Sequence, residues 1–331
     1  MTIRRIFVFI ILSLMVLQLS STAQTNFRRY AGEFMSIDVS ARARSMGGAF
    51  SAVSNDVYAT FYNPAGLPQV QSTQLGFTHT QQFLASINYD YIGFAQPISD
   101  NKTIGFSLVR LGVDNIQDSR AAAILGDDGT LLGIDQSKID NFNSADYVFF
   151  FSLGNRINSK LSWGFNAKLV RRNLANFNAN GLGFDAGLMY NVNNRFKISG
   201  MFRNITTTLI AWNSGEKELV SPTMRFGSSY FIPLPGLKSH FVPVVDFIVQ
   251  TQSTANLNDG SLGSGNFGGA FGGEFVIQET LFLRGGYDEL ARLNFGIGIH
   301  IPHIAVDYSF TGYDQELGNA HRIGIMVDFD K

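Results

Sequence analysis

The amino-acid sequence predicts an all-β protein: a transmembrane antiparallel β-barrel of about 14 strands, with an N-terminal hatch segment that contains short helices. Three observations support this prediction. Apolar and small polar residues alternate along many segments, the connections between those segments alternate in length, and only 15% of the 331 residues are charged. An average soluble domain carries about 25% charged residues, yet the mean hydropathy here is only +0.06.

The alternation separates two chemically different faces. In segments 161–169, 196–203, 293–300 and 304–310 every second residue is aromatic or aliphatic, and the residues between are glycine, serine, asparagine or an isolated charge. The chain has 30 phenylalanines and 34 glycines. A soluble sandwich also alternates, but its water-exposed face normally carries Lys and Glu. The pattern therefore favours a lipid-facing surface and a polar lumen.

The connections have the asymmetry of an outer-membrane barrel. We expect strands at residues 73–81, 87–96, 102–111, 145–154, 160–171, 182–190, 196–203, 222–232, 239–250, 268–277, 280–286, 292–300, 303–310 and 321–329. Tight turns are expected at 97–101, 155–159, 191–195, 233–238, 278–279 and 301–302, and longer loops at 112–144, 172–181, 204–221 and 251–267. An even strand count places both chain ends on the periplasmic side.

The first 23 residues read as a cleaved signal peptide. Arg4 and Arg5 precede an apolar run from Ile6 to Leu19, and small residues lead to Ala23. The run is shorter than the ~20 residues that a spanning helix needs. We therefore predict three parts: a signal peptide (1–23), a periplasmic segment and lumen hatch (24–72), and a barrel (73–331), located in the outer membrane of a Gram-negative bacterium.

The last strand carries a predicted barrel-assembly signal. Residues 322–329 hold a polar residue, a glycine, an apolar residue and a final aromatic, although two residues follow. This order resembles the signal that barrel-assembly machinery recognises, whereas the simpler interpretation is an ordinary final strand. The signal residues are Arg322, Gly324, Val327 and Phe329.

Residues 34–67 lack the long alternation and contain mostly small residues. Ser40 is expected to cap a short helix that runs through Met46, and Asp56 a second one at 57–62. The segment is too short to build a core of its own. A 14-stranded barrel encloses more space than its own side chains fill, so we expect this segment to plug the lumen.

Residues 41–67 (ARARSMGGAFSAVSNDVYATFYNPAGL) resemble the N-terminal segment of the PorV/PorQ family, within the wider FadL-like outer-membrane proteins. The shared hatch motif is Met46, Gly47, Gly48, Ala49, Asn63, Pro64, Ala65 and Gly66. The resemblance covers about 34 residues closely and the remainder only in layout. It implies a 14-stranded barrel with an N-terminal hatch. Enzymatic activity is not expected, because the sequence offers no catalytic constellation.

Two functions follow from this resemblance. The PorV/PorQ branch implies a component or partner of type IX protein secretion and surface attachment. The alternative is a FadL-like transporter of long-chain fatty acids or other hydrophobic molecules. The expected partners are outer-membrane lipids, the barrel-assembly machinery and secretion-system proteins, and a lipid or detergent molecule could be bound. FadL proteins generally have longer chains and larger outer loops. A complete ligand-capture site is therefore not implied for this chain.

Other chemistry is sparse. The absence of cysteine excludes disulfides, thiol catalysis and cysteine-bound metals, and a net charge of −1 without a basic block argues against nucleic-acid binding. His300, His303 and Asp307 lie close in sequence but on different strands, so no metal or catalytic site is expected. Loop 112–144 holds six aspartates, where a solvated turn is favoured over weak Ca²⁺ binding. No cofactor is predicted.

Charges on the lumen face are expected to pair with one another or with the hatch. Arg42 and Arg44 are the hatch candidates for a latch to Asp246, Glu274 or Asp307. Aromatic rings expected in an interface girdle are Tyr89, Tyr91, Tyr147, Trp163, Tyr190, Tyr230, Tyr287 and Tyr308. Pro243 interrupts the donors of its strand, which is compatible with a bulge or with a lateral gate.

Overall fold

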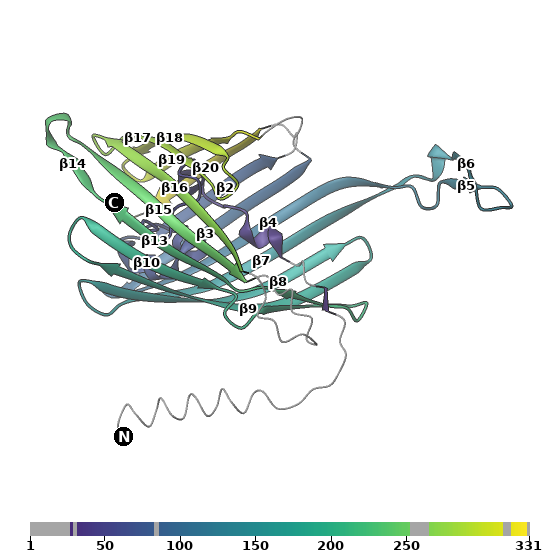
Figure 1. Cartoon of the computed structure of the whole chain (residues 1–331), viewed down its shortest axis with the longest axis horizontal. Coiled ribbons are helices and arrows are strands. Elements are labelled where there is room, and N and C mark those ends of the chain that lie inside the picture. Colours follow the sequence, from purple (N-terminus) through teal and green to yellow (C-terminus); the bar gives the residue numbers. More distant parts are fainter. Residues whose placement is uncertain (1–26, 29–31, 83–85, 252–264, 314–318, 330–331) are drawn as a thin grey trace, which may run out of the picture.

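Fourteen long antiparallel strands form a closed barrel (Figure 1). The computed structural model describes residues 27–28, 32–82, 86–251, 265–313 and 319–329. The predicted fold class and strand count are confirmed. The predicted signal peptide and most of the predicted loop 251–267 lie outside the described residues. Among the residues described, no helix is long and apolar enough to cross a membrane.

The strands follow one another around the wall. The barrel strands are β2 (Gln74–Gln82), β3 (Ile87–Ser99), β4 (Lys102–Asp118), β7 (Asp140–Arg156), β8 (Leu161–Leu174), β9 (Phe177–Asn191), β10 (Phe196–Arg203), β13 (Thr223–Tyr230), β15 (Ser239–Thr251), β16 (Gly265–Ile277), β17 (Leu281–Tyr287), β18 (Leu293–Ile301), β19 (Ile304–Thr311) and β20 (Ala320–Asp328). The shorter elements are β1 (Phe27–Arg28), β5 (Ala123–Leu125), β6 (Leu131–Ile134), η3 (Gln136–Lys138), β11 (Thr208–Trp212), β12 (Lys217–Val220), β14 (Ile232–Leu234) and η4 (Pro235–Leu237).

The last strand closes the barrel. β20 pairs antiparallel with β19 on one side and with β2 on the other, from Gln74 opposite Asp328 to Gln81 opposite His321. Arg322 and Gly324 face the interior, and the Arg322 Nε donates to Thr80 Oγ1 at 2.8 Å. The recognition of this strand by assembly machinery stays a prediction.

The long loops differ from the expectation at three places. β4 and β7 continue as a paired arm to Asp118 and Asp140, and β5 and β6 form a hairpin at its tip (Figure 1). β8 and β9 extend to a two-residue turn in place of the loop at 172–181. The segment 204–221 contains the β11–β12 hairpin, which lengthens the wall beside β9. In these three places the strands therefore stay hydrogen-bonded beyond the segments in which apolar and polar residues alternate.

The outer surface is an apolar belt. Along β18, for example, Phe295, Ile297 and Ile299 are exposed, whereas the intervening residues face inward. Phe77, Phe106, Phe165, Leu188, Phe226, Phe247, Phe271, Leu283, Val306 and Ile323 extend this belt around the barrel. A surface of this size is far larger than the apolar patches of soluble monomers, and it has the composition of a lipid-facing band.

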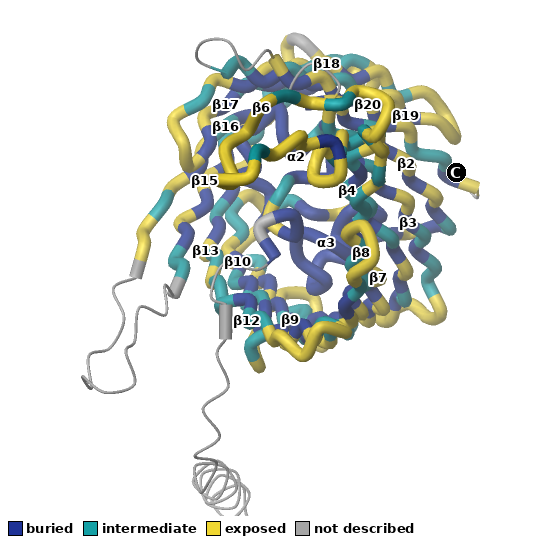
Figure 2. The backbone as a smooth tube through the Cα atoms, turned by 90° about the vertical axis from the view of Figure 1, so that its right-hand side faces the viewer, coloured by how far each residue is buried: buried dark blue, intermediate teal, exposed yellow. Residues whose placement is uncertain are grey.

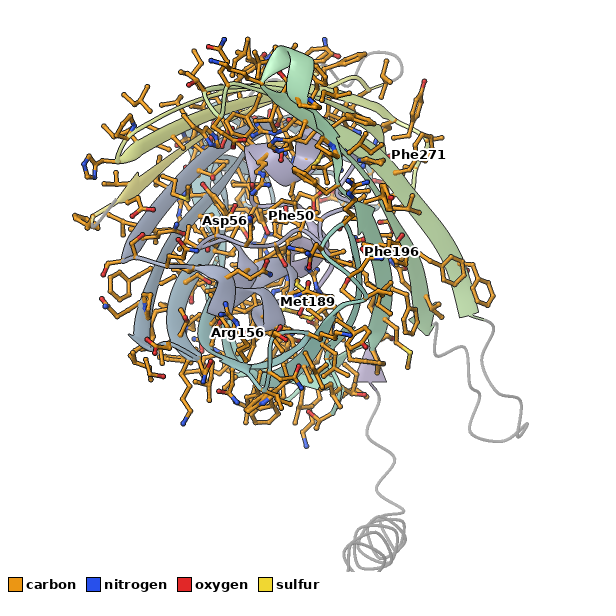
Figure 3. The ribbon with its side chains drawn as sticks, turned by 90° about the vertical axis from the view of Figure 1, so that its left-hand side faces the viewer. Phe50, Asp56, Arg156, Met189, Phe196 and Phe271 are labelled. Atoms are coloured by element: carbon orange, nitrogen blue, oxygen red, sulfur yellow. The ribbon has the colours of Figure 1, made fainter. Side chains whose placement is uncertain are left out.

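The N-terminal segment fills the lumen. Its elements are η1 (Glu33–Ser36), α2 (Ala41–Ser45), α3 (Ala59–Tyr62) and η2 (Pro64–Gln69). They lie inside the ring of strands and are almost entirely buried (Figure 2). η1 lies toward the end with the long connections and η2 at the end with the short turns. Phe50 and Asp56 lie in the middle of the lumen, and Arg156 and Met189 lie near its short-turn mouth (Figure 3). We call residues 32–70 the hatch.

Polar side chains fix the ends of the hatch helices. Ser40 Oγ accepts from the Ala43 backbone N–H at 3.3 Å and caps α2, and Gly47 and Gly48, with φ of 69° and 79°, end it. The second helix begins two residues later than predicted. Asp56 Oδ1 accepts from the Tyr58 backbone N–H at 3.0 Å, and α3 starts at Ala59.

Pro243 lies in β15 opposite Gly273 of β16, and this ladder continues without interruption from Ser239 to Thr251. On its other side, β15 leaves β13 after Val244 and pairs with β14 from Phe241. The missing donor of Pro243 therefore coincides with the break between β13 and β14, near the short turns.

Candidate functional site: the contact between hatch and barrel wall

Glycines of the wall allow the hatch backbone to touch the strands. A Cβ added to Gly164 would lie 2.1 Å from the Pro64 carbonyl carbon, and one on Gly296 would lie 1.8 Å from Ser45 Oγ. The other wall glycines where an added Cβ would clash with the hatch are Gly76, Gly105, Gly154, Gly187, Gly227, Gly272 and Gly286. The lumen glycines therefore match the shape of the hatch.

The second half of the hatch motif forms the tightest part of this contact. Asn63 Oδ1 accepts from the Ala65 N–H at 3.1 Å and caps η2, and its Nδ2 donates to the Ser51 carbonyl at 3.0 Å. A Cβ on Gly66 would lie 1.7 Å from the Ser54 carbonyl oxygen. Asn63, Pro64, Ala65 and Gly66 are all buried. The hydrogen bonds of Asn63 and the missing side chain of Gly66 therefore allow the hatch to fold back on itself.

The first half of the motif packs against the opposite wall. Met46 is 0% exposed, and its backbone lies against Gly272 and Gly286. A Cβ on Gly47 would lie 2.2 Å from the Tyr287 carbonyl oxygen. The small residues of the motif therefore bring the loop after α2 into direct contact with β16 and β17.

Arg42 joins the hatch to β16 through charge. Its Nε and Nη2 donate to the two Glu274 carboxylate oxygens, both at 2.9 Å, and its Nη1 lies 3.0 Å from Asp56 Oδ2. Glu274 also accepts from Arg284 Nε at 2.7 Å, and Arg284 Nη1 lies 2.6 Å from Asp307 Oδ1. The structure brings Arg42 and Glu274 together, whereas Asp307 is reached only through Arg284.

Arg44 pairs with carboxylates that the sequence did not indicate. Its Nη1 lies 3.0 Å from Asp38 Oδ2 on the hatch, and its Nη2 lies 2.6 Å from Asp288 Oδ2 just after β17. Burial alone would raise the pKa of Asp38, but the guanidinium groups of Arg44, Arg225 and Arg322 outweigh burial and lower that pKa below 3.8. The Asp38 charge therefore contributes stability above about pH 4 that is lost as the pH falls.

Asp246 holds the hatch without either predicted arginine. Its Oδ2 accepts from the Phe50 and Ser51 backbone N–H groups, both at 3.3 Å, and its Oδ1 accepts from Ser51 Oγ at 2.7 Å. Its cationic neighbour is Arg225, 3.6 Å away, which also donates to the Gly48 carbonyl. Asp246 thus binds the hatch by accepting hydrogen bonds from its backbone, and it forms no ion pair with Arg42 or Arg44.

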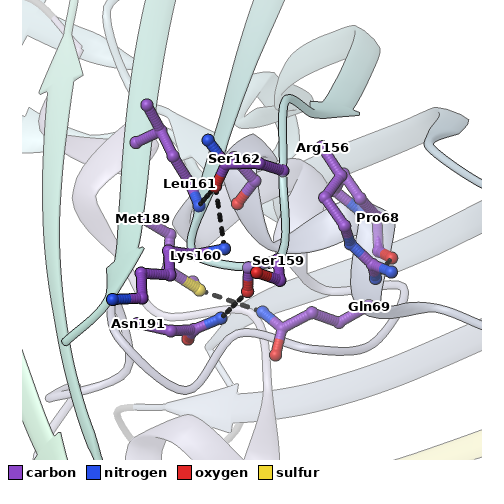
Figure 4. A pocket seen from close by; sticks show the side chains of 10 residues that line it. Pro68, Gln69, Arg156, Ser159, Lys160, Leu161, Ser162, Met189 and Asn191 are labelled. Carbon is purple, nitrogen blue, oxygen red and sulfur yellow. Dashed lines mark hydrogen bonds between the residues drawn. The ribbon is translucent and has the colours of Figure 1, made fainter. Parts of the chain in front are cut away.

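The short-turn end of the hatch is held by two cations that sequence reasoning missed. Arg156 Nη2 donates to the Pro68 carbonyl, and Lys197 Nζ donates to Gln69 Oε1 at 2.9 Å. Gln69 Nε2 lies 2.9 Å from Met189 Sδ. Pro68, Gln69, Arg156 and Met189 line a cavity of about 300 Å³ between the end of η2 and the turn after β7 (Figure 4). The sequence could have indicated these two cations, because Arg156 and Lys197 fall at inward-facing positions of their strands.

Tyr89 and Tyr91 were wrongly assigned to the interface girdle. Both face the lumen and are 1% exposed. Tyr89 donates to the Phe34 carbonyl at 2.9 Å, and Tyr91 donates to the Val57 carbonyl at 3.0 Å. They occupy the same face of β3 as the glycine at position 93, and this small neighbour was the signal of a lumen position. The other proposed girdle residues Tyr147, Trp163, Tyr190, Tyr230, Tyr287 and Tyr308 are exposed or half-buried.

Three further lumen cations are paired with carboxylates or bonded to the hatch. Lys168 Nζ lies 2.6 Å from Asp185, and Arg172 pairs with Asp146 and with Glu218 of β12. Arg203 Nη2 donates to the Phe61 carbonyl at 2.9 Å. Lys168, Asp185 and Arg203 line a cavity of about 20 Å³ next to Met35 and Ser36 of the hatch, close to the space that one water molecule occupies.

The described residues contain no cluster of three His, Asp or Glu side chains that could hold a metal. His300 Nε2 lies 3.2 Å from Asp307 Oδ1, which Arg284 also binds. In the loop where weak Ca²⁺ binding was considered, Asp128 accepts from Thr130, as a solvated turn does.

Comparison with solved structures identifies barrels of the same fold. The chain is similar to the CymD monoaromatic hydrocarbon channel (TM-score 0.58, 12% identity, 88% of this chain and 98% of that chain). It is also similar to the Pseudomonas putida toluene transporter TodX (0.56, 13%, 88% and 97%) and to a Pseudomonas aeruginosa FadL homologue (0.55, 10%, 88% and 98%). No protein-family model and no curated protein sequence matches.

Replacing Glu274 by Gln is expected to loosen the hatch. The substitution removes the carboxylate that Arg42 and the buried Arg284 share and leaves each with one acidic partner, Asp56 or Asp307. Removing one partner of a buried ion pair costs about 3–5 kcal/mol. Hydrogen exchange of the amides at 40–58 should therefore become faster. Glu279→Gln is the matched control, because the Glu279 side chain is 76% exposed. Equal exchange in both variants would show that the pair does not hold the hatch.

Replacing Gly164 by Ala is expected to push the end of the hatch away from β8. The added Cβ would meet Pro64 backbone, and such overpacking costs about 1–3 kcal/mol. Thermal unfolding should shift to lower temperature. Gly285→Ala is the control, because its Cβ would meet no atom closer than 3.8 Å on the outer face. If both variants unfold at the same temperature as the parent protein, close contact at Gly164 does not stabilise the hatch.

Proposed function

We propose that this protein is a FadL-like outer-membrane barrel through which small hydrophobic molecules cross the membrane when the hatch moves. The observation that supports this most is its similarity in fold, over 88% of the chain, to CymD, a monoaromatic hydrocarbon channel. The similar structures are transport channels and not enzymes. The exposed apolar belt is consistent with an outer-membrane location.

The geometry of the lumen adds a condition to this proposal. The cavity at the short-turn end of the hatch measures about 300 Å³, the lower limit of the about 300–1,000 Å³ of small-molecule pockets. The cavity between η1 and the wall measures about 20 Å³. A hydrocarbon therefore needs the hatch to shift before it can pass. The contact of hatch and wall is lined by Phe50, Phe61, Tyr62 and Phe150, so an apolar molecule would meet aromatic rings once the hatch moves.

A reversible crosslink between hatch and wall tests this proposal. Ser51 Oγ on the hatch lies 2.9 Å from Ser199 Oγ on β10, and the chain has no native cysteine. In Ser51→Cys/Ser199→Cys, oxidation should reduce toluene uptake by cells to the rate of cells without the protein, and reduction should restore it. Ser51→Cys alone should not respond to oxidant. Uptake that continues in the crosslinked barrel would contradict the proposal.

The second candidate is a partner of type IX secretion of the PorV/PorQ kind, and the arm of β4–β7 favours it. The arm projects beyond the other long connections (Figure 1). At its tip five aliphatic side chains are 49–69% exposed, namely Ile124, Leu125, Leu131, Leu132 and Ile134. Exposed aliphatic groups on a water-facing hairpin are typical of a protein contact. In this role the partner protein would bind the arm, and no molecule would need to pass through the lumen.

Substitution of the arm tip distinguishes the second candidate from the first. Leu125→Ser/Leu131→Ser/Leu132→Ser should abolish co-purification of a stoichiometric secretion-channel component and leave toluene uptake unchanged. Gln136→Ala, an exposed polar position on the same arm, should keep the partner. Secretion that continues normally in cells without the protein would exclude this candidate.

A further inference from the structure

Two consecutive short turns share one sequence pattern and one backbone geometry. Residues 157–161 (INSKL) and 192–196 (VNNRF) both place an asparagine second and a cation fourth. Asn158 Oδ1 accepts from the backbone N–H groups two and three residues later, both at 2.9 Å. Asn193 Oδ1 does the same at 2.8 Å. The turns therefore present their cations, Lys160 and Arg195, in equivalent positions.

These two cations border one cavity. Lys160 and Arg195 line an open cavity of about 490 Å³, together with Val192, Asn194 and Tyr230. The turns are tied together, because the Asn191 backbone N–H donates to the Lys160 carbonyl at 2.7 Å. Within the described residues, neither Lys160 nor Arg195 forms an ion pair with a carboxylate. The cavity thus carries two positive charges that have no counter-ion among the described residues.

The cavity lies at the edge of the apolar belt. Tyr190 is paired with Leu161, and Tyr230 with Phe196, one residue from each cation. Both tyrosines are on the outer face, 38% and 42% exposed, and Trp163 follows on the same face of β8. Tyrosine and tryptophan favour the headgroup level of a membrane. Lys160 and Arg195 are therefore placed where lipid headgroups lie.

We propose that this cavity binds the phosphodiester headgroup of an anionic phospholipid in the leaflet that faces the short turns. The Lys160 ammonium and the Arg195 guanidinium supply the positive charge and donors that a phosphate group requires. The acyl chains would lie along the outward-facing Phe196 and Ile198. This site is independent of passage through the lumen.

Native mass spectrometry of the barrel in neutral detergent tests the site with phosphatidylglycerol as the probe. The protein should retain phosphatidylglycerol in preference to phosphatidylcholine. Lys160→Gln/Arg195→Gln should weaken this binding about thirtyfold, because a basic residue at an anionic lipid surface contributes about 1 kcal/mol and 1.4 kcal/mol is a factor of ten. Both residues are exposed or at the cavity edge, and a heat-shift gel confirms that the variant is folded.

A second double variant separates a site from general rim charge. Lys102→Gln/Lys238→Gln also removes two exposed cations from short turns and should retain the lipid. Equal loss in both double variants, unchanged binding in Lys160→Gln/Arg195→Gln, or equal retention of phosphatidylcholine would overturn the proposal. Displacement of the lipid by millimolar inorganic phosphate would also overturn it and assign the cavity to a free anion.

Discussion

Direct contact between the hatch backbone and the glycines of the barrel wall is the constraint on which the rest of this structure depends. A wall of side chains would leave the hatch no room, since an added Cβ at Gly164 or Gly296 would overlap hatch atoms. The same glycines lower the mean hydropathy of a chain with a strongly apolar outer face. The unusual composition is therefore the average of a lipid-facing belt and a wall shaped for its plug.

Close contact also excludes water, and this determines how the charges are arranged. Arg44 is buried and the Arg42 side chain is only 14% exposed, so each needs carboxylates on two sides, and these come from the hatch and from the wall. Charges that cross between the two parts join them in a fixed position. A buried ion pair adds little net stability compared with apolar packing, but it specifies which position is correct. Under the proposed transport function, such specificity would return the hatch to one position after it moves.

The sequence was sufficient for the barrel and insufficient for the contacts within it. Period-two alternation and the short turns predict fourteen strands, because the pleat places every second side chain in lipid. The partners Asp288 and Asp38 of Arg44 could not be predicted, since one lies after a distant strand. The turn at Ala175 was also missed because no glycine marks its positive φ. Tyr89 was misplaced because aromatic character alone does not tell lumen from membrane.

The central claim is that residues 32–70 close the lumen of the native barrel. Electrical conductance across a planar bilayer measures this most directly. We expect the full chain, inserted in the bilayer, to show no conductance steps, whereas a barrel without the hatch should show the steps of an open pore. Open-pore steps from the full chain, equal to those of the hatchless barrel, would contradict the account.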